Sequence, residues 1–513
     1  MGTLGFSGCG APFALCGAGC LGRPGTFPDH HPEASRYPRT RLSRAERIMT
    51  NGGDGSGSPT AHDVAVVGAG VVGCTVAWAL TKAGRRVLLI DRADPATAGA
   101  SFGNVGHIAT EQLQPLPSPQ LLLSFWRELV AFGGVLDIPL RRVAVMAPWM
   151  VRFALAAFHQ SSNTRHLAPL VRNAADALHS QLCEVGRGDL LRRNGHYALW
   201  LGRQAAAHAA AERVRASNLG IATGDAPAEL VRAAAAAAHR ANASASGPVA
   251  GAPSPLPAPC ETNAATAISS AAAPALAASA ASPAAAGVWF PDSAHVLDPA
   301  LLARAFASAS VQSGASILRA DVRHMRPQGN RIELVTDTGA FSVRTAVVCA
   351  GAWSAPLLAP FGIHAPLEAE RGYHVELLDH APLVDAPILY ADHSLVVTPM
   401  ASRLRASSYL EFAGLGAPAD PHKPTQLRTK LRQLGYQCNT EGSSWMGPRP
   451  TLPDYLPGIG RARGPHELFY AVGHQHIGLT LAAVTADLIA DLVIGRTPRF
   501  NVQAFDLDRF GSP

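Results

Sequence analysis

The segment Asp63-Val-Ala-Val-Val-Gly68-Ala-Gly70-Val-Val-Gly73 decides the fold of this chain. A short apolar run ends at Gly68, and the pattern that follows predicts a helix directly after a tight turn. Gly70 lets a phosphate approach the backbone, and Gly73 lets the helix pack against the strand. The free N–H groups at the start of that helix attract phosphate. The segment therefore predicts the first strand, turn and helix of a nucleotide-binding domain.

A second apolar run, Val87-Leu-Leu-Ile-Asp91, ends in an acid about twenty residues after the glycines, as a dinucleotide site requires. The carboxylate of Asp91 can accept hydrogen bonds from both ribose hydroxyls and would repel a 2′-phosphate. The loop Gly99-Ala-Ser101-Phe-Gly103-Asn104-Val-Gly106-His107 then stands where an NAD-dependent dehydrogenase would continue its parallel sheet. A loop of this composition suits the longer chain of FAD.

Two later segments agree with FAD. Residues 346–354 read as a buried strand that runs into a small-residue turn, and residues 468–480 read as a strand that leads to a helix start. A helix N-terminus near the flavin would stabilise the negative charge that develops there on reduction. The second segment lies near the C-terminus, so the chain is expected to return to its first domain.

Composition narrows the classes of partner and the compartment. The 513 residues carry 43 Lys and Arg against 37 Asp and Glu, with no basic run, which argues against nucleic acid as a partner. The eight cysteines show no metal-ligand or disulfide spacing, so neither a metal site nor a disulfide framework is predicted. No stretch reaches the ~18–20 uninterrupted apolar residues of a membrane span. We expect a reduced, cytoplasmic protein.

The fold class expected is α/β: a Rossmann-like FAD-binding domain with an inserted α+β substrate domain built on a mixed or antiparallel sheet. Residues 1–60 read as a disordered leader, and both a transit peptide and translation from Met49 stay open. Residues 224–286, rich in Ala and Pro, read as a flexible surface insertion without an apolar stripe. The remaining boundaries place the FAD-binding domain at 61–115, 287–365 and 441–513, a helical and substrate-domain segment at 116–223, and the substrate-binding domain at 366–440.

With these segments the chain resembles the FAD-dependent oxidoreductases of the D-amino-acid oxidase fold, and most of all the bacterial D-amino-acid dehydrogenases. The resemblance covers residues from about Asp63 to Pro498 apart from the insertion. Its further blocks are Phe290-Pro-Asp292, Ala350-Gly-Ala-Trp-Ser354, Glu370-Arg-Gly-Tyr-His374, Gly447-Pro-Arg-Pro450 with Pro453-Asp454, and Gly473-His474 with Gly478-Leu-Thr480. Two departures stand out, because Val105 replaces a small residue and Ser408-Tyr-Leu-Glu411 replaces a Gly-rich strand start.

The resemblance implies which residues bind FAD: Gly68, Gly70, Gly73, Asp91, Arg92, Ser101, Asn104, the backbone of Val322, Ala350, Gly473, Gly478, Leu479 and Thr480. It also implies that Arg449 holds the substrate carboxylate through two parallel hydrogen bonds. Tyr373 and His374 match a pair that faces the flavin and binds the carboxylate or the amine, and His476 is expected to line the pocket. The alternatives are a surface arginine for Arg449, an edge-strand aromatic side chain for Tyr373, a solvent-facing histidine for His374 and a structural, hydrogen-bonding histidine for His476.

The activity expected from the resemblance is oxidation of the Cα–N bond of a D-amino acid, or of a cyclic D-imino acid such as D-hydroxyproline, by hydride transfer to flavin N5. One alternative is a glycine- or sarcosine-type secondary amine oxidase, and another is a flavin-holding subunit of a multi-chain dehydrogenase. The electron acceptor is left open between oxygen, a quinone and another acceptor. Apolar helical stretches at 121–132 and 149–158 suggest peripheral contact with the inner membrane, with core packing as the alternative.

Overall fold

A computed structural model describes residues 62–129, 134–245, 285–378, 381–438 and 442–511. Its first sheet has six strands in the order β10-β2-β1-β14-β21-β20. The strands are β10 (Ser316–Arg319), β2 (Val87–Asp91), β1 (Val64–Val67), β14 (Thr345–Val348), β21 (Glu467–Val472) and β20 (Gly458–Arg461). All neighbours run parallel except β20, which pairs with β21 antiparallel. The predicted opening strands and the predicted C-terminal return are therefore present.

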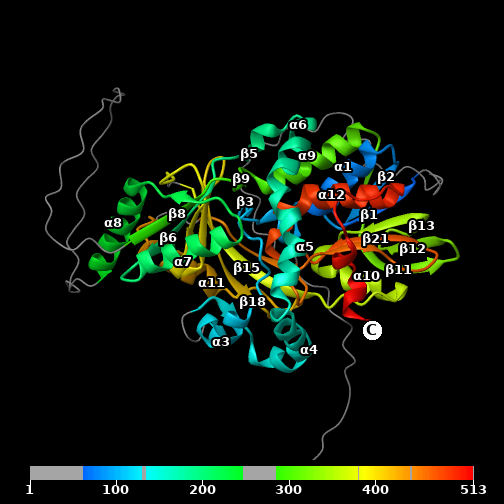
Figure 1. Ribbon diagram of the computed structural model, residues 1–513. Helices are drawn as coiled ribbons and strands as arrows, with labels where there is room; N and C mark the ends of the chain where they lie inside the picture. The colour runs from blue at the N-terminus through cyan, green and yellow to red at the C-terminus, as the bar shows by residue number, and fades with distance from the viewer. Residues whose placement is uncertain (1–61, 130–133, 246–284, 379–380, 439–441, 512–513) are drawn as a thin grey trace, which may run out of the picture. The chain divides into compact units, whose positions relative to one another are not determined.

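Both faces of this sheet are covered, which is why β1 is buried along its whole length. Val64 and Val66 face the helices α1 (Val71–Lys82), α9 (Pro299–Gln312) and α12 (Gly478–Ile494). Ala65 and Val67 face a three-stranded antiparallel sheet of β11 (Val322–Gln328), β12 (Arg331–Thr336) and β13 (Ala340–Val343). Figure 1 shows α1 and α9 with α12 on one side of the strands and β11–β13 on the other.

The second large sheet is mixed and runs in the order β19-β15-β18-β17-β16-β6-β8-β7, with β4 beside β18. Its strands are β19 (Ser444–Thr451), β15 (Glu368–Leu377), β18 (Leu404–Glu411), β17 (Leu395–Pro399), β16 (Ile388–Tyr390), β6 (His196–Leu201), β8 (Ala285–Phe290), β7 (Gly224–Asp225) and β4 (Leu136–Asp137). Helices α7 (Ala205–Asn218), α8 (Ala228–Ala245) and α11 (His422–Gln433) pack on it. The predicted fold class, an FAD-type α/β domain with an inserted sheet domain, is confirmed.

The remaining elements join the two sheets. A small sheet of β3 (His107–Ile108), β9 (Ala294–Val296) and β5 (Leu191–Arg192) brings together three distant parts of the chain. The other helices are α2 (Gly99–Phe102), α3 (Pro119–Glu128), α4 (Leu140–Ala157), α5 (Gln160–Arg172), α6 (Ala174–Glu184) and α10 (Ser354–Leu358). Short 3-10 helices lie at 188–190, 351–353, 359–361, 391–393, 475–477, 503–505 and 507–510.

The prediction of a flexible insertion over residues 224–286 is wrong for its two ends. Strand β7 pairs with β8, and α8 buries Leu230 and Ala234 against the large sheet. The apolar stripe of α8 consists largely of alanines, whose small side chains allow the helix to pack closely. A Cβ atom on Gly435, for example, would lie only 2.5 Å from Ala237 Cβ. Residues 246–284, like the predicted leader at 1–60, lie outside the described residues.

Two predicted boundaries also shift. The predicted FAD-binding segments begin at residues 287 and 441. Strand β8, which ends at Phe290, and strand β19, which ends at Thr451, instead belong to the large sheet. Sequence spacing assigned them to the FAD-binding domain because neither strand's partner is local.

One helix among the described residues, Gln475–Ile494, is long and apolar enough to cross a membrane, with a mean hydropathy of 2.0. Most of that segment, 67%, is buried inside the protein. It includes α12, which packs on α1 and receives a hydrogen bond from Thr75 Oγ1 to the carbonyl oxygen of Ala482. The position of this helix is that of a central core helix.

Candidate active site

The turn after β1 has the geometry that a pyrophosphate requires. Gly68 has φ +107°, and a Cβ atom there would lie 2.4 Å from the carbonyl oxygen of Cys349. A Cβ atom on Gly73 would lie 1.8 Å from the carbonyl oxygen of Gly68. Only glycine can occupy both positions without moving the backbone of β14 or of the turn. The turn can therefore bring backbone N–H groups close to a ligand.

The N-terminus of α1 opens onto the same place. The N-cap residue, Gly70, has no side chain to cap the helix. The N–H of Val71 donates to Ser101 Oγ over 2.9 Å. The first turn of a helix carries unpaired N–H groups and a partial positive charge. This end of α1, with the hydroxyl of Ser101, is an anion site suited to phosphate.

Asp91 closes the second strand with both carboxylate oxygens oriented. Oδ2 accepts a hydrogen bond from the N–H of Ala69 (2.6 Å), and Oδ1 accepts one from the N–H of Ala93 (3.1 Å). The next residue, Arg92, lays its guanidinium over the ring of Trp353 at 4.1 Å. A carboxylate held in this way can accept ribose hydroxyls, with the Arg92–Trp353 stack beside it.

A cavity of about 810 Å³ extends from this turn to the large sheet. Its size is in the upper part of the range for ligand pockets, as a dinucleotide requires. The predicted residues on its wall are Gly68, Gly70, Asp91, Arg92, Ser101, Asn104, Val322, Ala350, Tyr373, Arg449, His476, Gly478 and Leu479. The structure thus brings residues from widely separated parts of the chain, from Gly68 to Leu479, to one cavity.

Three predicted cofactor residues act beside the cavity rather than on its wall. Gly73 serves the contact between helix and strand, and Gly473 (φ +71°) ends β21 against Leu452. Thr480 is buried, and its Oγ1 accepts a hydrogen bond from the N–H of Ala109 over 3.1 Å. These three positions shape the backbone around the cavity and do not themselves line the cavity.

The residues on the wall fit FAD. The Gly68–Gly73 turn would hold the pyrophosphate, and Asp91 the ribose. The N-terminus of α12, which has no side-chain cap, presents Gly478 and Leu479 to the cavity. Its partial positive charge would favour the negative charge that the flavin ring gains on reduction.

Arg449 lies on the cavity wall at the large-sheet end. Its Nη1 donates to Glu370 Oε1 (3.1 Å) and to the carbonyl oxygen of Tyr409 (3.4 Å). Glu370 is fully buried and also accepts from Thr451 Oγ1 and Tyr455 OH. Among the described residues these bonds involve only Nη1, so Nε and Nη2 remain for a carboxylate. The arrangement is suited to the predicted two-bond clamp.

Tyr373 lies on the cavity wall, but its hydroxyl is bonded within the protein. Its hydroxyl donates to Glu411 Oε2 (2.7 Å) and accepts from Arg371 Nη2 (3.0 Å) and from the N–H of Asp420 (2.9 Å). Burial raises the pKa of this phenol to about 12. The prediction that the phenol binds the substrate is therefore corrected, because its hydrogen-bonding capacity is already used.

His374 lies on the other side of β15, away from the cavity. Its Nδ1 donates to the carbonyl oxygen of Gly103 (2.8 Å), and its ring stacks on Trp445. Burial, together with the nearby charge of Arg405, lowers the pKa of His374 to about 3. Successive strand residues point to opposite faces, so Tyr373 and His374 cannot face one pocket together. The substrate role predicted for His374 is wrong, and so is its alternative of a solvent-facing histidine, because the side chain is buried and bonded to Gly103.

His476 faces the cavity, and its Nε2 lies 2.7 Å from Gln112 Oε1. The protein around it lowers the pKa of His476 to about 4, chiefly by burial, so the ring is neutral near pH 7. A neutral imidazole here can orient a polar group but carries no charge of its own.

Several residues that the sequence does not distinguish also shape the site. Arg405 donates to the carbonyl oxygen of Asn104 (2.6 Å) and pairs with Glu376, which holds the Asn104 loop against β18. Tyr409 lines the cavity with φ +72°, a conformation that favours glycine. It stands in the segment Ser408–Glu411, which the resemblance marks as a departure, and that departure is the available signal. Glu370 belongs to a block of the resemblance but carries no predicted role there, and nothing local marks Gln112.

A dinucleotide-binding turn, two open helix ends and an anchored arginine on one cavity define a flavin-dependent oxidoreductase. The family model described as FAD dependent oxidoreductase (DAO) matches residues 63–256 and 257–492, and the chain belongs to this family. The predicted cofactor, FAD, is confirmed at the level of the family.

Relatives cover nearly the same length of chain. The chain is 28% identical over 469 residues to a D-amino-acid oxidase of Bradyrhizobium diazoefficiens, covering 88% of this chain and 100% of the relative. It is 28% identical over 462 residues to a D-amino acid dehydrogenase of Paramagnetospirillum magneticum, covering 88% and 99%.

Solved structures show the same fold at lower identity. The glycine oxidase from Geobacillus kaustophilus superposes with a TM-score of 0.61 at 20% identity, over 87% of this chain and 98% of that one. The L-proline dehydrogenase from P. horikoshii superposes with a TM-score of 0.61 at 15% identity, over 88% and 97%.

Proposed function

We propose that this flavoenzyme oxidises the Cα–N bond of a D-amino acid or of a cyclic D-imino acid. The observation that carries the proposal is Arg449, which lies on the wall of the cofactor cavity with Nη1 bound to Glu370. A planar guanidinium held in this way selects a substrate with a carboxylate. The names of the relatives support an amino acid of D configuration.

The residues of the chain orient the substrate and exclude water. Nε and Nη2 of Arg449 bind the carboxylate and thereby fix the direction of the Cα–H bond. The rings of Tyr373 and Tyr409 supply an apolar wall, while Gln112 and the neutral His476 offer polar atoms. When bound, FAD supplies the acceptor for the hydride. The amine must react as the free base, since its lone pair drives the hydride out, and the proton that it loses goes to solvent.

The product of this oxidation is an imine. Water converts an acyclic imine to a 2-oxo acid and ammonia, whereas a ring retains the nitrogen. Anaerobic mixing of the yellow holoenzyme with each enantiomer of many amino acids, followed by flavin bleaching, tests the proposal. Bleaching by glycine or sarcosine alone would indicate the secondary-amine alternative. Absence of bleaching together with co-purifying chains would indicate a flavin-holding subunit.

We further propose that the electrons pass to a quinone at a membrane surface, with the enzyme in the cytoplasm and peripheral to the inner membrane. Helix α4 supports this, because it carries a second apolar stripe opposite its buried face. Leu140, Val151 and Phe158 are 91%, 59% and 72% exposed, and they recur at helical spacing with Val143 and Leu155. A helix of this kind can lie in the interface of a bilayer. Figure 1 places α4 beside α3 at one end of the large sheet.

Two measurements test the acceptor and the contact. Stopped-flow mixing of reduced enzyme with oxygen and with a quinone in vesicles compares the two reoxidation rates. The double variant Leu140→Glu with Val151→Glu should lose binding to vesicles of anionic lipid and keep its activity with a dye acceptor. Val214→Glu, on the exposed face of α7, is the matched control. Equal vesicle binding by the parent protein, the double variant and Val214→Glu would contradict the proposed membrane contact of α4.

A further inference from the structure

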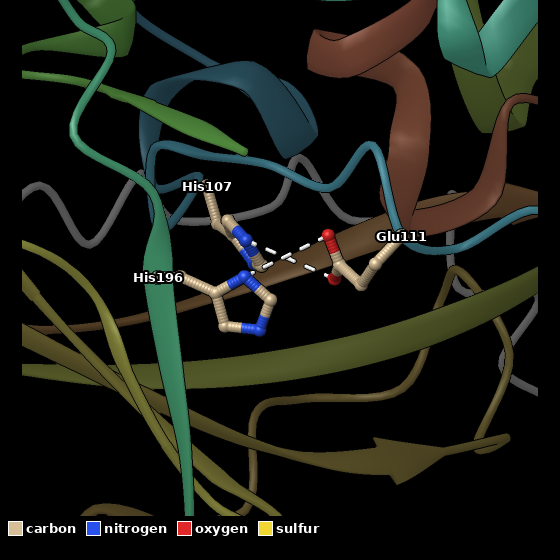
Figure 2. Close-up of side chains that lie close together, drawn as sticks. All are labelled: His107, Glu111 and His196. Atoms are coloured by element: carbon tan, nitrogen blue, oxygen red, sulfur yellow. Dashed lines mark ion pairs between the residues drawn. The ribbon is translucent and has the colours of Figure 1, made fainter. Parts of the chain in front are cut away.

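Three buried side chains outside the substrate clamp converge between the two sheets. Figure 2 shows His107 from β3, Glu111 from the segment after it and His196 from the start of β6 facing one another. Their side chains are 9%, 9% and 2% exposed. The amino-acid oxidation proposed above uses none of these three side chains.

The distances within this His107–Glu111–His196 cluster are too long for hydrogen bonds. His107 Nε2 lies 3.8 Å from Glu111 Oε1, and His196 Nδ1 lies 3.7 Å from Glu111 Oε2. Neither of these two ring nitrogens has a hydrogen-bond partner among the described residues. Buried polar atoms in proteins nearly always have a partner, so two such atoms aimed at one carboxylate need an explanation.

A salt bridge does not explain the cluster. Burial lowers the pKa of His107, and it lowers the pKa of His196 to about 4, so both rings are neutral near pH 7. Burial raises the pKa of Glu111, but the hydrogen bond from Ser293 Oγ favours the ionised form, and the pKa of this carboxyl group is lowered. The cluster thus holds an ionised carboxylate and two neutral imidazoles around one gap.

We propose that this cluster binds a divalent metal ion of the Zn²⁺ class. The three ligand atoms lie within 4.8 Å of one another. With metal–ligand bonds of about 2.0–2.2 Å, two ligands of one tetrahedral ion lie roughly 3.3–3.6 Å apart, slightly less than the two distances observed. Two imidazoles and one carboxylate form a known ligand set for zinc and for non-haem iron, and nitrogen ligands disfavour Ca²⁺ and Mg²⁺.

The surroundings support a metal ligand role for Glu111. Ser293 Oγ donates to Glu111 Oε2 (2.8 Å) and lies 3.2 Å from Thr110 Oγ1. Hydrogen bonds of this kind orient ligating carboxylates in metal sites. The nearby Arg215 does not fill the gap, because its Nη2 and Nε donate to Glu212 over 2.5 and 2.9 Å.

A second acidic cluster in the chain provides the contrast. Asp137, Glu411 and Asp420 also lie close enough to share a metal ion. The ammonium of Lys423 already occupies that place, at 2.5, 3.8 and 3.6 Å from their oxygens. The His107–Glu111–His196 cluster has no such internal cation among the residues that the structure describes. Its charge balance and open nitrogens therefore favour an external ion.

The ion would connect two parts of the molecule. His107 lies on the wall of the cofactor cavity, and Ala109, two residues later, is bonded to Thr480 of α12. His196 belongs to the large sheet. Metal binding would therefore fix segment 107–111 between the six-stranded sheet and the large sheet, and would raise the stability of the holoenzyme.

The test uses the full-length holoenzyme without a polyhistidine tag. After treatment with a chelator, Zn²⁺ is titrated by calorimetry, and Co²⁺ is added to record visible absorption at wavelengths beyond those of the flavin. We expect one ion per chain, a rise in unfolding temperature that saturates with Zn²⁺, and the strong absorption of a four-coordinate Co²⁺ site. Absence of binding, or weak binding without that absorption, would overturn the proposal.

The matched variants are Glu111→Gln and His208→Gln. Loss of an outer-shell partner already weakens metal binding by 10–100-fold, so removal of the ligand in Glu111→Gln should weaken it by more than about 100-fold. His208→Gln removes an exposed histidine that lies 3.5 Å from Asp392, and its affinity should equal that of the parent. Parent-like affinity in Glu111→Gln would disprove the site. If that variant does not fold, the Co²⁺ spectrum of the parent protein decides.

Discussion

The two ends of the cavity bind by different means. At the end near β1 the ligand would meet backbone N–H groups and one carboxylate, all set by a turn of six residues and the next strand. At the large-sheet end it would meet side chains, and the position of Arg449 depends on Glu370, which lies on a neighbouring strand. Backbone sites therefore follow from local sequence, whereas side-chain sites depend on strand register.

The largest effect is expected from a change in the backbone end. Gly68→Ala places a Cβ atom 2.4 Å from the carbonyl oxygen of Cys349 in a left-handed conformation. We expect the purified variant to contain little or no flavin, measured by absorbance after denaturation. Gly416→Ala, where a Cβ atom would meet nothing within 4 Å, should keep its full flavin content. Normal flavin content in Gly68→Ala would remove the distinction between the two ends.

The next effect concerns the side-chain end. Arg449→Ala removes a charged partner of the substrate, which costs about 2–5 kcal/mol, or roughly 30- to 5,000-fold in kcat/KM. The flavin content should stay normal, because Arg449 lies apart from the dinucleotide turn. Arg463→Ala, an exposed arginine, serves as the control. Unchanged turnover of every amino acid by Arg449→Ala would show that the clamp is assigned to the wrong residue.

A smaller effect tests the position of the guanidinium rather than its presence. A Cβ atom on Gly372 would lie 2.1 Å from Nη2 of Arg449, so Gly372→Ala must displace that group. Misplacement of a binding group by about 1 Å can cost up to ~10²-fold in rate, and we expect a rise in KM of about 10- to 100-fold with flavin content unchanged. Steady-state kinetics with the best substrate measure it. An unaltered KM would mean that Arg449 tolerates movement.

The last effect concerns the pH dependence of stability rather than cofactor or substrate binding. Burial lowers the pKa of His474 to about 4, below its ordinary value of about 6.5. The unfolded chain therefore takes up a proton as pH falls below about 6.5, and the folded chain does not until about 4, so stability falls across this range by up to about 3 kcal/mol. In His474→Gln the unfolding temperature should fall less steeply over the same range. Identical slopes for parent and variant would exclude this contribution.

The sequence was most informative where neighbouring residues share one element. The strand, turn and helix of 63–73 and the acid Asp91 were predicted and lie as expected, because tight turns, helix ends and strand ends depend on nearby residues. The alanine-rich segment at 228–245 was misread, because its helix is stabilised by packing on a sheet formed from residues far away in the chain. Composition alone does not show such a partner.

Tertiary structure decided the rest. Residues Tyr373 and His374 are adjacent in sequence, yet the pleat of β15 sends one ring to the cavity and the other to Gly103. Two contacts join residues up to 89 positions apart in the chain. Glu370 anchors Arg449, and His107 and Glu111 meet His196. Such contacts form only when strand pairing buries the side chains side by side. Their chemistry then depends on which polar groups are removed from water in the same place. The cofactor could therefore be inferred from a motif, whereas the substrate clamp and the proposed metal site required the folded chain.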